Sequence, residues 1–119
     1  MENSFALGPR SDERFKEDKV KKIISDVLRF FLADGLTYDT KDCAKLACLM
    51  TEEIKSRVKE LRYTRYKVVA YVVIGKVNGQ GSHVASRGLW DTANDGMASV
   101  KMTIQDMFAV GVVFATYFE

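Results

Sequence analysis

Two stretches in the second half of the chain consist almost entirely of apolar residues. Residues 68–74 have no polar side chain except the hydroxyl of Tyr71, and residues 107–118 have no charged side chain. A strand with one face in water alternates apolar and polar residues, so these runs predict strands that are buried on both faces. Their expected limits are Tyr66–Ile74 and Met107–Phe118.

Two further strands are predicted between these runs. Residues His83–Trp90 mix polar and apolar positions, which is typical of an edge or interface strand, whereas Ala98–Ile104 alternates regularly. The Asn78-Gly79 pair and Gly81 supply the residues that a reversal after the first strand requires. Gln105-Asp106 is a short link between the last two strands.

The first half of the chain shows helical periodicity instead. Helices are predicted over residues 14–34, with Ser11 or Asp12 as the N-cap and Gly35 after the last turn, and over residues 40–61. Two apolar stripes support them. They consist of Val20, Ile23, Ile24, Val27, Leu28 and Phe31 in the first helix, and of Cys43, Leu46, Ala47, Met50, Ile54, Val58 and Leu61 in the second.

The order of these elements defines the fold class. Two helices followed by four strands with short connections predict an α+β domain, in which the strands pair antiparallel and the helices lie on one face. Residues 1–14 are expected to form an N-terminal arm and residues 15–119 the domain. Two helices normally cover one face of a sheet only. A second apolar face and two open edges therefore predict an obligate dimer.

Composition restricts the function. A chain of 119 residues forms one domain, and a net charge of +2 gives little reason to expect an acidic partner. Residues 1–10 lack the pattern of a secretory signal, and the apolar run at residues 107–118 is too short to span a bilayer, so the chain is expected in the cytosol. Cys43 and Cys48 are expected to be buried or half-buried helix residues that cannot form a disulfide with each other.

No reactive group of residues stands out. His83 is the only histidine, and no nucleophile lies at a suggestive spacing from it. The glycine-rich residues 78–82 lack the ending of a phosphate-binding loop. Residues 91–96 resemble the start of a calcium loop, but Ala93 and Met102 stand at positions where such a loop has ligands. We therefore expect no catalytic residue, cofactor or metal, and a binding module is favoured over an unrecognised enzyme.

Basic residues on the first helix leave one alternative open. Such a helix could bind a membrane or nucleic-acid surface, although acidic residues dilute its charge and favour a solvated face. Six charged residues of the second helix lie mostly off its stripe and are also expected to be solvated, namely Glu52, Glu53, Lys55, Arg57, Lys59 and Glu60. The basic residues of the first helix are Arg14, Lys16, Lys19, Lys21, Lys22 and Arg29.

Several segments together resemble the Tctex-type dynein light chains. The segments are R-Y-K-V-V-A-Y-V-V-I-G from Arg65, N-G-Q-G from Asn78, V-A-S-R-G-L-W-D from Val84 and F-A-V-G-V-V-F-A-T-Y-F-E from Phe108. The resemblance covers residues 15–119. The opening Glu2-Asn3-Ser4-Phe5 is similar to that of the Tctex2 branch of this family.

The resemblance implies a function as well as a fold. It implies two helices packed on a four-stranded antiparallel sheet, in a dimer whose second strand crosses to the partner's sheet. The dimer would be non-catalytic and would bind dynein intermediate chains, whose segment adds as an extra strand. A Tctex2-type chain is expected to pair with a Tctex1-type chain, although a homodimer stays open, and to act in the cytoskeleton at the axoneme of a cilium. The alternative is a cargo adaptor of cytoplasmic or intraflagellar-transport dynein.

The resemblance also points to the residues that bind partners. Their backbone groups would pair with the neighbouring subunit and the incoming peptide, while Arg87 and Trp90 would add selectivity. Arg65 and Tyr66 are expected at the junction between helix and sheet. Gly88 stands where many family members have cysteine. The predicted partner-binding residues are His83, Val84, Ala85, Ser86, Arg87, Gly88, Leu89 and Trp90.

Overall fold

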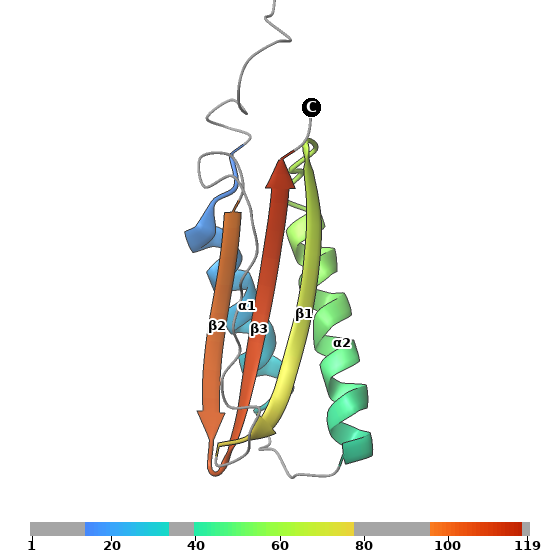
Figure 1. Cartoon of the computed structure of the whole chain (residues 1–119), viewed down its shortest axis with the longest axis vertical. Coiled ribbons are helices and arrows are strands. Elements are labelled where there is room, and N and C mark those ends of the chain that lie inside the picture. The colour runs from blue at the N-terminus through green and yellow to red at the C-terminus, as the bar shows by residue number, and fades with distance from the viewer. Residues whose placement is uncertain (1–13, 34–39, 78–95, 118–119) are drawn as a thin grey trace, which may run out of the picture.

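The computed structural model describes residues 14–33, 40–77 and 96–117. These residues form two helices and then three strands, and the predicted ranges differ from the observed ones only at the ends (Figure 1). The predicted strand His83–Trp90, residues 1–13 of the predicted N-terminal arm and Gly35 lie outside the described residues. The elements are α1 (Glu17–Phe31), α2 (Thr40–Lys59), β1 (Tyr66–Lys76), β2 (Gly96–Ile104) and β3 (Met107–Tyr117).

The start of α1 differs from the prediction. We expected Ser11 or Asp12 as the N-cap, but the N-cap residue is Lys16, whose side chain makes no capping hydrogen bond. The cap is the residue just before the first helical one, so neither predicted residue holds that position. Glu17 and Asp18 in the first turn still place negative charge at the positive end of the helix dipole.

The three strands form one antiparallel sheet with β3 in the centre. The order is β1-β3-β2, and Gly111 of β3 lies opposite Val72 on one side and Val100 on the other. Gln105 has a positive φ of 56°, which closes the short turn between β2 and β3 as the sequence predicted. Because β3 is central, β1 and β2 are the two edges of the described sheet.

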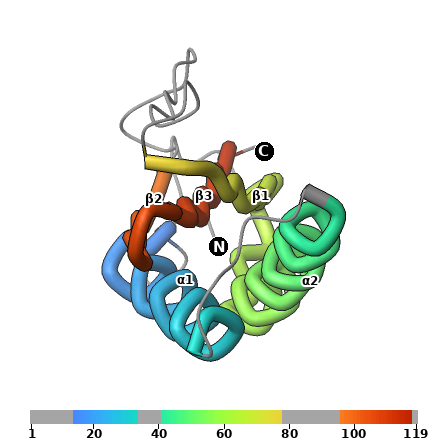
Figure 2. Tube along the Cα trace, turned by 90° about the horizontal axis from the view of Figure 1, so that it is seen from below, coloured from blue at the N-terminus to red at the C-terminus, as the bar shows by residue number. Residues whose placement is uncertain are grey.

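The helices cover one face of this sheet, as predicted. The α1 helix lies against β2 and β3, and α2 lies against β1 (Figure 2). Both predicted apolar stripes face the core, because every helix residue that is fully enclosed belongs to one of them. The fully enclosed helix residues are Val20, Ile24, Val27 and Leu28 of α1 and Met50, Ile54 and Val58 of α2.

The opposite face of the sheet, which we call the second face, carries its own apolar cluster. At its centre Phe108, Val110 and Val112 of β3 are at most 6% exposed. Val69 of β1, on the same face, is 49% exposed. The prediction of a second apolar face is confirmed. In this single chain its centre is buried and Val69 is exposed, so the predicted burial of β1 on both faces requires a second subunit.

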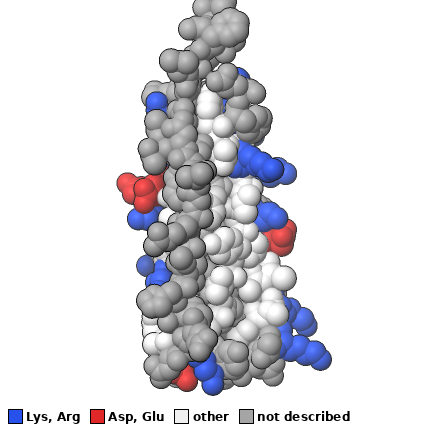
Figure 3. Space-filling model, viewed as in Figure 1, with Lys and Arg blue, Asp and Glu red and all other residues white. Residues whose placement is uncertain are grey.

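The exposed part of the second face is a strip along β1. Figure 3 views this face, and uncharged described atoms lie between flanks that carry both basic and acidic residues. Tyr71 and Val73 are half-buried there beside Val69. Tyr71 also contacts the ring of Phe114, with 6.4 Å between the ring centroids. The β1 strip is therefore apolar surface that water reaches.

The two cysteines differ in their surroundings. Both are free thiols, and Cys43 is buried as expected. Cys48 is exposed, which contradicts the prediction of a buried or half-buried residue. Five positions separate the two on α2, so their side chains point in different directions around the helix.

Candidate partner-binding site

The predicted partner-binding residues all lie outside the described residues. The segment that contains them, residues 78–95, joins the two edge strands. It leaves β1 next to the β2–β3 turn, where the Val77 amide donates to the Asp106 carbonyl at 2.8 Å. It rejoins the sheet at Gly96, which lies opposite Ala115 near the far end of β3. The two ends of the segment are therefore separated by the length of β2.

Tyrosine hydroxyls anchor the chain that leads into α1. The Lys16 amide donates to the Tyr63 hydroxyl at 2.9 Å, and the Phe15 amide donates to the Tyr66 hydroxyl at 3.2 Å. The rings also touch, with 5.7 Å between the centroids of Tyr63 and Tyr66 and 5.5 Å between those of Tyr66 and Tyr117. Tyr66 thus stands at the junction between helix and sheet, where the resemblance placed it.

Burial raises the pKa of the Tyr63 hydroxyl above its ordinary value. The amide proton from Lys16 partly opposes this shift, and the neighbouring Tyr66 hydroxyl adds to it. The folded protein therefore holds this proton more tightly than the unfolded chain does. The stability that results is present below pH about 10 and is lost as the pH rises through the raised pKa.

Replacing Tyr63 with phenylalanine should remove that alkaline loss of stability. The variant loses one hydrogen bond to the Lys16 amide, so its free energy of unfolding at pH 7 should fall by about 0.5–1.5 kcal/mol. Urea denaturation at pH 7 and at pH 10.5 measures both effects. A variant whose stability falls between these pH values as much as the wild type's would contradict this role of Tyr63.

Arg65 is the other junction residue that the resemblance indicated. It is half-buried, and its Nε atom is buried without a hydrogen-bond partner. An unsatisfied buried donor costs about 1–3 kcal/mol, and more when it belongs to a charged group. The junction therefore holds a donor that this single chain leaves unsatisfied.

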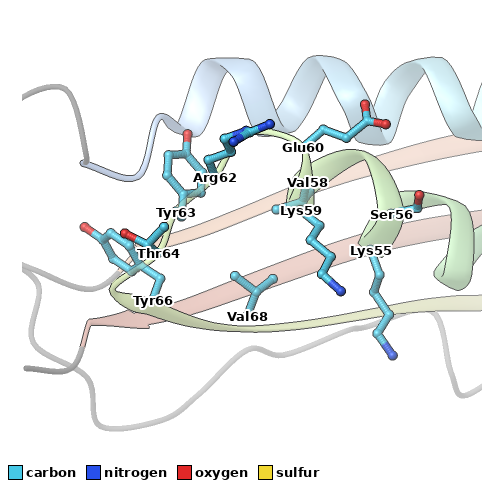
Figure 4. Close-up of a pocket in the computed structure, with 10 residues that line it drawn as sticks. All are labelled: Lys55, Ser56, Val58, Lys59, Glu60, Arg62, Tyr63, Thr64, Tyr66 and Val68. Carbon is cyan, nitrogen blue, oxygen red and sulfur yellow. The ribbon is translucent and has the colours of Figure 1, made fainter.

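A cavity of about 790 Å³ lies beside this junction. Its lining comes from α2, the α2–β1 turn and the start of β1, and none of it comes from α1, β2 or β3. Figure 4 shows Lys55 and Lys59 reaching from α2 past Val68 of β1, with Tyr63 and Tyr66 at the other end. The lining residues are Lys55, Ser56, Val58, Lys59, Glu60, Arg62, Tyr63, Thr64, Tyr66 and Val68.

The described part of the chain has neither a cluster of metal-binding side chains nor a helix that could cross a membrane. Among residues 14–33, 40–77 and 96–117, no three His, Cys, Asp or Glu side chains gather in a way that could hold a metal ion. Neither helix of this part of the chain is long and apolar enough to cross a membrane. The site's features are thus the two sheet edges, the β1 strip and the cavity beside Tyr66.

Comparison with known proteins identifies the family. The model of the Tctex-1 family matches residues 14–116. Dynein light chain Tctex-type protein 2B of Danio rerio is 31% identical to this chain over 116 residues, which are 98% of this chain and 77% of that protein. The chain therefore belongs to the Tctex-1 family, and the resemblance seen in its sequence is confirmed.

Other relatives are longer than this chain. Dynein light chain Tctex-type 5-B of Xenopus laevis is 36% identical over the whole chain, which spans 66% of that protein. Dynein light chain Tctex-type 4 of Mus musculus is 39% identical, and the chain spans 54% of it. The chain thus spans between about half and two thirds of the length of these two relatives.

Proposed function

We propose that this chain is a non-catalytic dynein light chain that dimerises and binds a segment of a dynein intermediate chain. The single observation that carries the proposal is the family match, which covers nearly all the described residues. The relatives named above are all called dynein light chains. The described fold supports the proposal, because it offers surfaces for other chains to complete.

Three features of the fold favour completion by another chain. Both edge strands, β1 and β2, have one side without a described neighbour, and an edge strand presents unpaired N–H and C=O groups. The β1 strip exposes apolar surface around Val69. The Arg65 Nε atom lacks a partner, and another chain can supply an acceptor for it.

The length of residues 78–95 is compatible with an exchange of strands between subunits. The segment must bridge about 30 Å, the length of a nine-residue strand such as β2. Fully extended, it would reach about 60 Å. We propose that His83–Trp90 uses this spare length to pair with the sheet of a second subunit, and that the intermediate-chain segment adds as a further strand beside it.

We propose a Tctex1-type light chain as the partner and an axonemal dynein as the motor. Co-sedimentation of the native chain with purified axonemes tests the location. The expected result is a chain that stays with the axoneme and is released together with dynein. A chain found only in the cytoplasmic fraction would instead favour the adaptor of cytoplasmic or intraflagellar-transport dynein.

Titration of an intermediate-chain peptide into the dimer tests the binding function. Trp90→Ala should weaken binding at least tenfold, because truncation of a central interface tryptophan commonly costs about 2 kcal/mol or more. Lys19→Glu, on the exposed face of α1, is the control and should leave the affinity unchanged. If Lys19→Glu weakened binding and Trp90→Ala did not, the basic face of α1 would be the binding surface instead.

A further inference from the structure

Four aromatic rings gather at the end of the molecule where α1, β1 and β2 begin and β3 ends (Figure 1). The centroid of the Phe15 ring lies 5.7 Å from that of Tyr63 and 6.3 Å from that of Tyr66, and Tyr66 also contacts Tyr117. The rings come from four parts of the chain, which are the entry to α1, the α2–β1 turn, the start of β1 and the end of β3. We call these four residues the aromatic cluster.

Phe15 is held in the aromatic cluster by its backbone as well as by its ring. Its amide donates to the Tyr66 hydroxyl at 3.2 Å, and the amide of Lys16 donates to the Tyr63 hydroxyl at 2.9 Å. In Figure 4 the Tyr63 hydroxyl points toward the chain that enters α1. The Phe15 ring is half-buried and packs against the core. Phe15 therefore has a defined position, although it lies before the first helical residue.

The Phe15 ring lies directly on Gly96, the first residue of β2. A Cβ atom added at Gly96 would lie 2.7 Å from the Phe15 Cγ atom and 2.9 Å from the Phe15 Cε2 atom, so a larger residue would displace the ring. Gly96 also pairs with Ala115 of β3. The ring on one side and the pairing with β3 on the other therefore fix the start of β2.

The start of β2 is the point at which residues 78–95 rejoin the sheet. A slip of one residue in the pairing of a strand turns all its side chains to the other face, so the position of Gly96 sets the register of β2. A frayed start of β2 would have to be ordered again when a partner binds, and such ordering costs free energy. A fixed Gly96 therefore prepares the chain for binding.

We propose that Phe15 and Gly96 are positioning residues for partner binding. The Phe15 ring holds the start of β2 in the sheet, so that residues 78–95 depart from a defined place before a partner arrives. This inference rests on the proposed function, because that function assigns partner binding to His83–Trp90. It also couples the chain before Phe15 to the partner, since whatever displaces Phe15 releases the start of β2 and whatever fixes β2 holds Phe15 more firmly.

Phe15→Ala tests the inference through the dissociation constant of the dimer, formed with a second copy of this chain or with a Tctex1-type light chain. Dilution of the labelled full chain in fluorescence-detected sedimentation measures this constant, and the variant should raise it at least tenfold. Phe31→Ala is the matched control. It removes the same side chain from a half-buried position that also packs against the core, but at the other end of α1, and should stay within threefold of the wild type.

Gly96→Ala tests the contact from the other side. Its methyl group displaces the Phe15 ring, so the dissociation constant should rise at least threefold. Combined with Phe15→Ala the clash disappears, and the loss of affinity should be at least threefold smaller than the product of the two single losses. Without any partner, hydrogen exchange at the first amides of β2 should be faster in Phe15→Ala than in Phe31→Ala.

The outcomes separate this inference from the proposed function. A wild type that dimerises with neither chain would overturn the proposed function, and this inference with it. If the wild type dimerises but Phe15→Ala and Phe31→Ala weaken the dimer equally, Phe15 acts through stability alone, and only this inference fails. It fails likewise if exchange at the start of β2 is the same in both variants, or if the losses in Phe15→Ala and Gly96→Ala simply multiply.

Discussion

Replacing Phe108 with alanine should lower the free energy of unfolding by about 3–5 kcal/mol, a large share of the stability of a domain this size. The side chain is 1% exposed at the centre of the second face. Its ring occupies the space above Gly75, where an added Cβ would lie 2.9 Å from the Phe108 Cζ atom. The Lys101 Nζ atom also lies 5.2 Å from the ring centroid, a contact that alanine cannot make.

Phe30→Ala is the matched control for this prediction. It removes the same side chain from a position on α1 that is 73% exposed, so the loss should stay within about 0.5 kcal/mol. Urea denaturation of both variants at equal protein concentration measures the difference. Similar losses in the two variants would mean that the second face is not packed as described.

Gly111→Ala should also destabilise the protein strongly, by about 1–3 kcal/mol. Alanine in the middle of a strand is ordinarily more stable than glycine by about 0.5–1 kcal/mol, so the expected sign is opposite to the intrinsic one. The reason is contact with the helices. A Cβ atom at residue 111 would lie 2.5 Å from the Ile24 Cγ2 atom and 3.4 Å from the Ile54 Cδ1 atom.

Ile24→Ala provides the test of that contact. Alone it should cost about 2–5 kcal/mol, since it leaves a cavity between α1 and the sheet. Combined with Gly111→Ala it removes the methyl group that the new Cβ meets, so the double variant should lose at least about 0.5 kcal/mol less than the sum of the single losses. Strict additivity would show that α1 does not press on β3 at this position.

The sequence predicted which segments form helices and strands, because the repeat of apolar residues that marks a helix or a strand is a local property. The stripe that includes Ile24 repeats at helical spacing, and the alternation from Ala98 to Ile104 repeats every second residue. The end of a helix depends on distant residues as well. The chain entering α1 is anchored by the hydroxyls of Tyr63 and Tyr66, which are 47 and 51 residues away from the amides that they accept. No local pattern near Ser11 or Asp12 carries that information.

The two candidate sites also differ in how far the sequence could predict them. The prediction for His83–Trp90 came from a family resemblance, and it stays a prediction because those residues lie outside the described ones. The cavity beside Tyr66 was missed, because Lys55 and Lys59 were interpreted as part of a solvated helix face. They are exposed, as predicted, but the turn at Arg62 brings the start of β1 beside them. Only the folded chain places the lysines along a strand edge.

Native mass spectrometry at micromolar concentration tests most directly whether this chain is completed by others. The chain is measured alone and after mixing with a Tctex1-type light chain. We predict a complex of two chains in at least one sample, either twice the 13.4 kDa of this chain or the sum of the two different masses. A stable 13.4 kDa monomer in both samples would contradict the account.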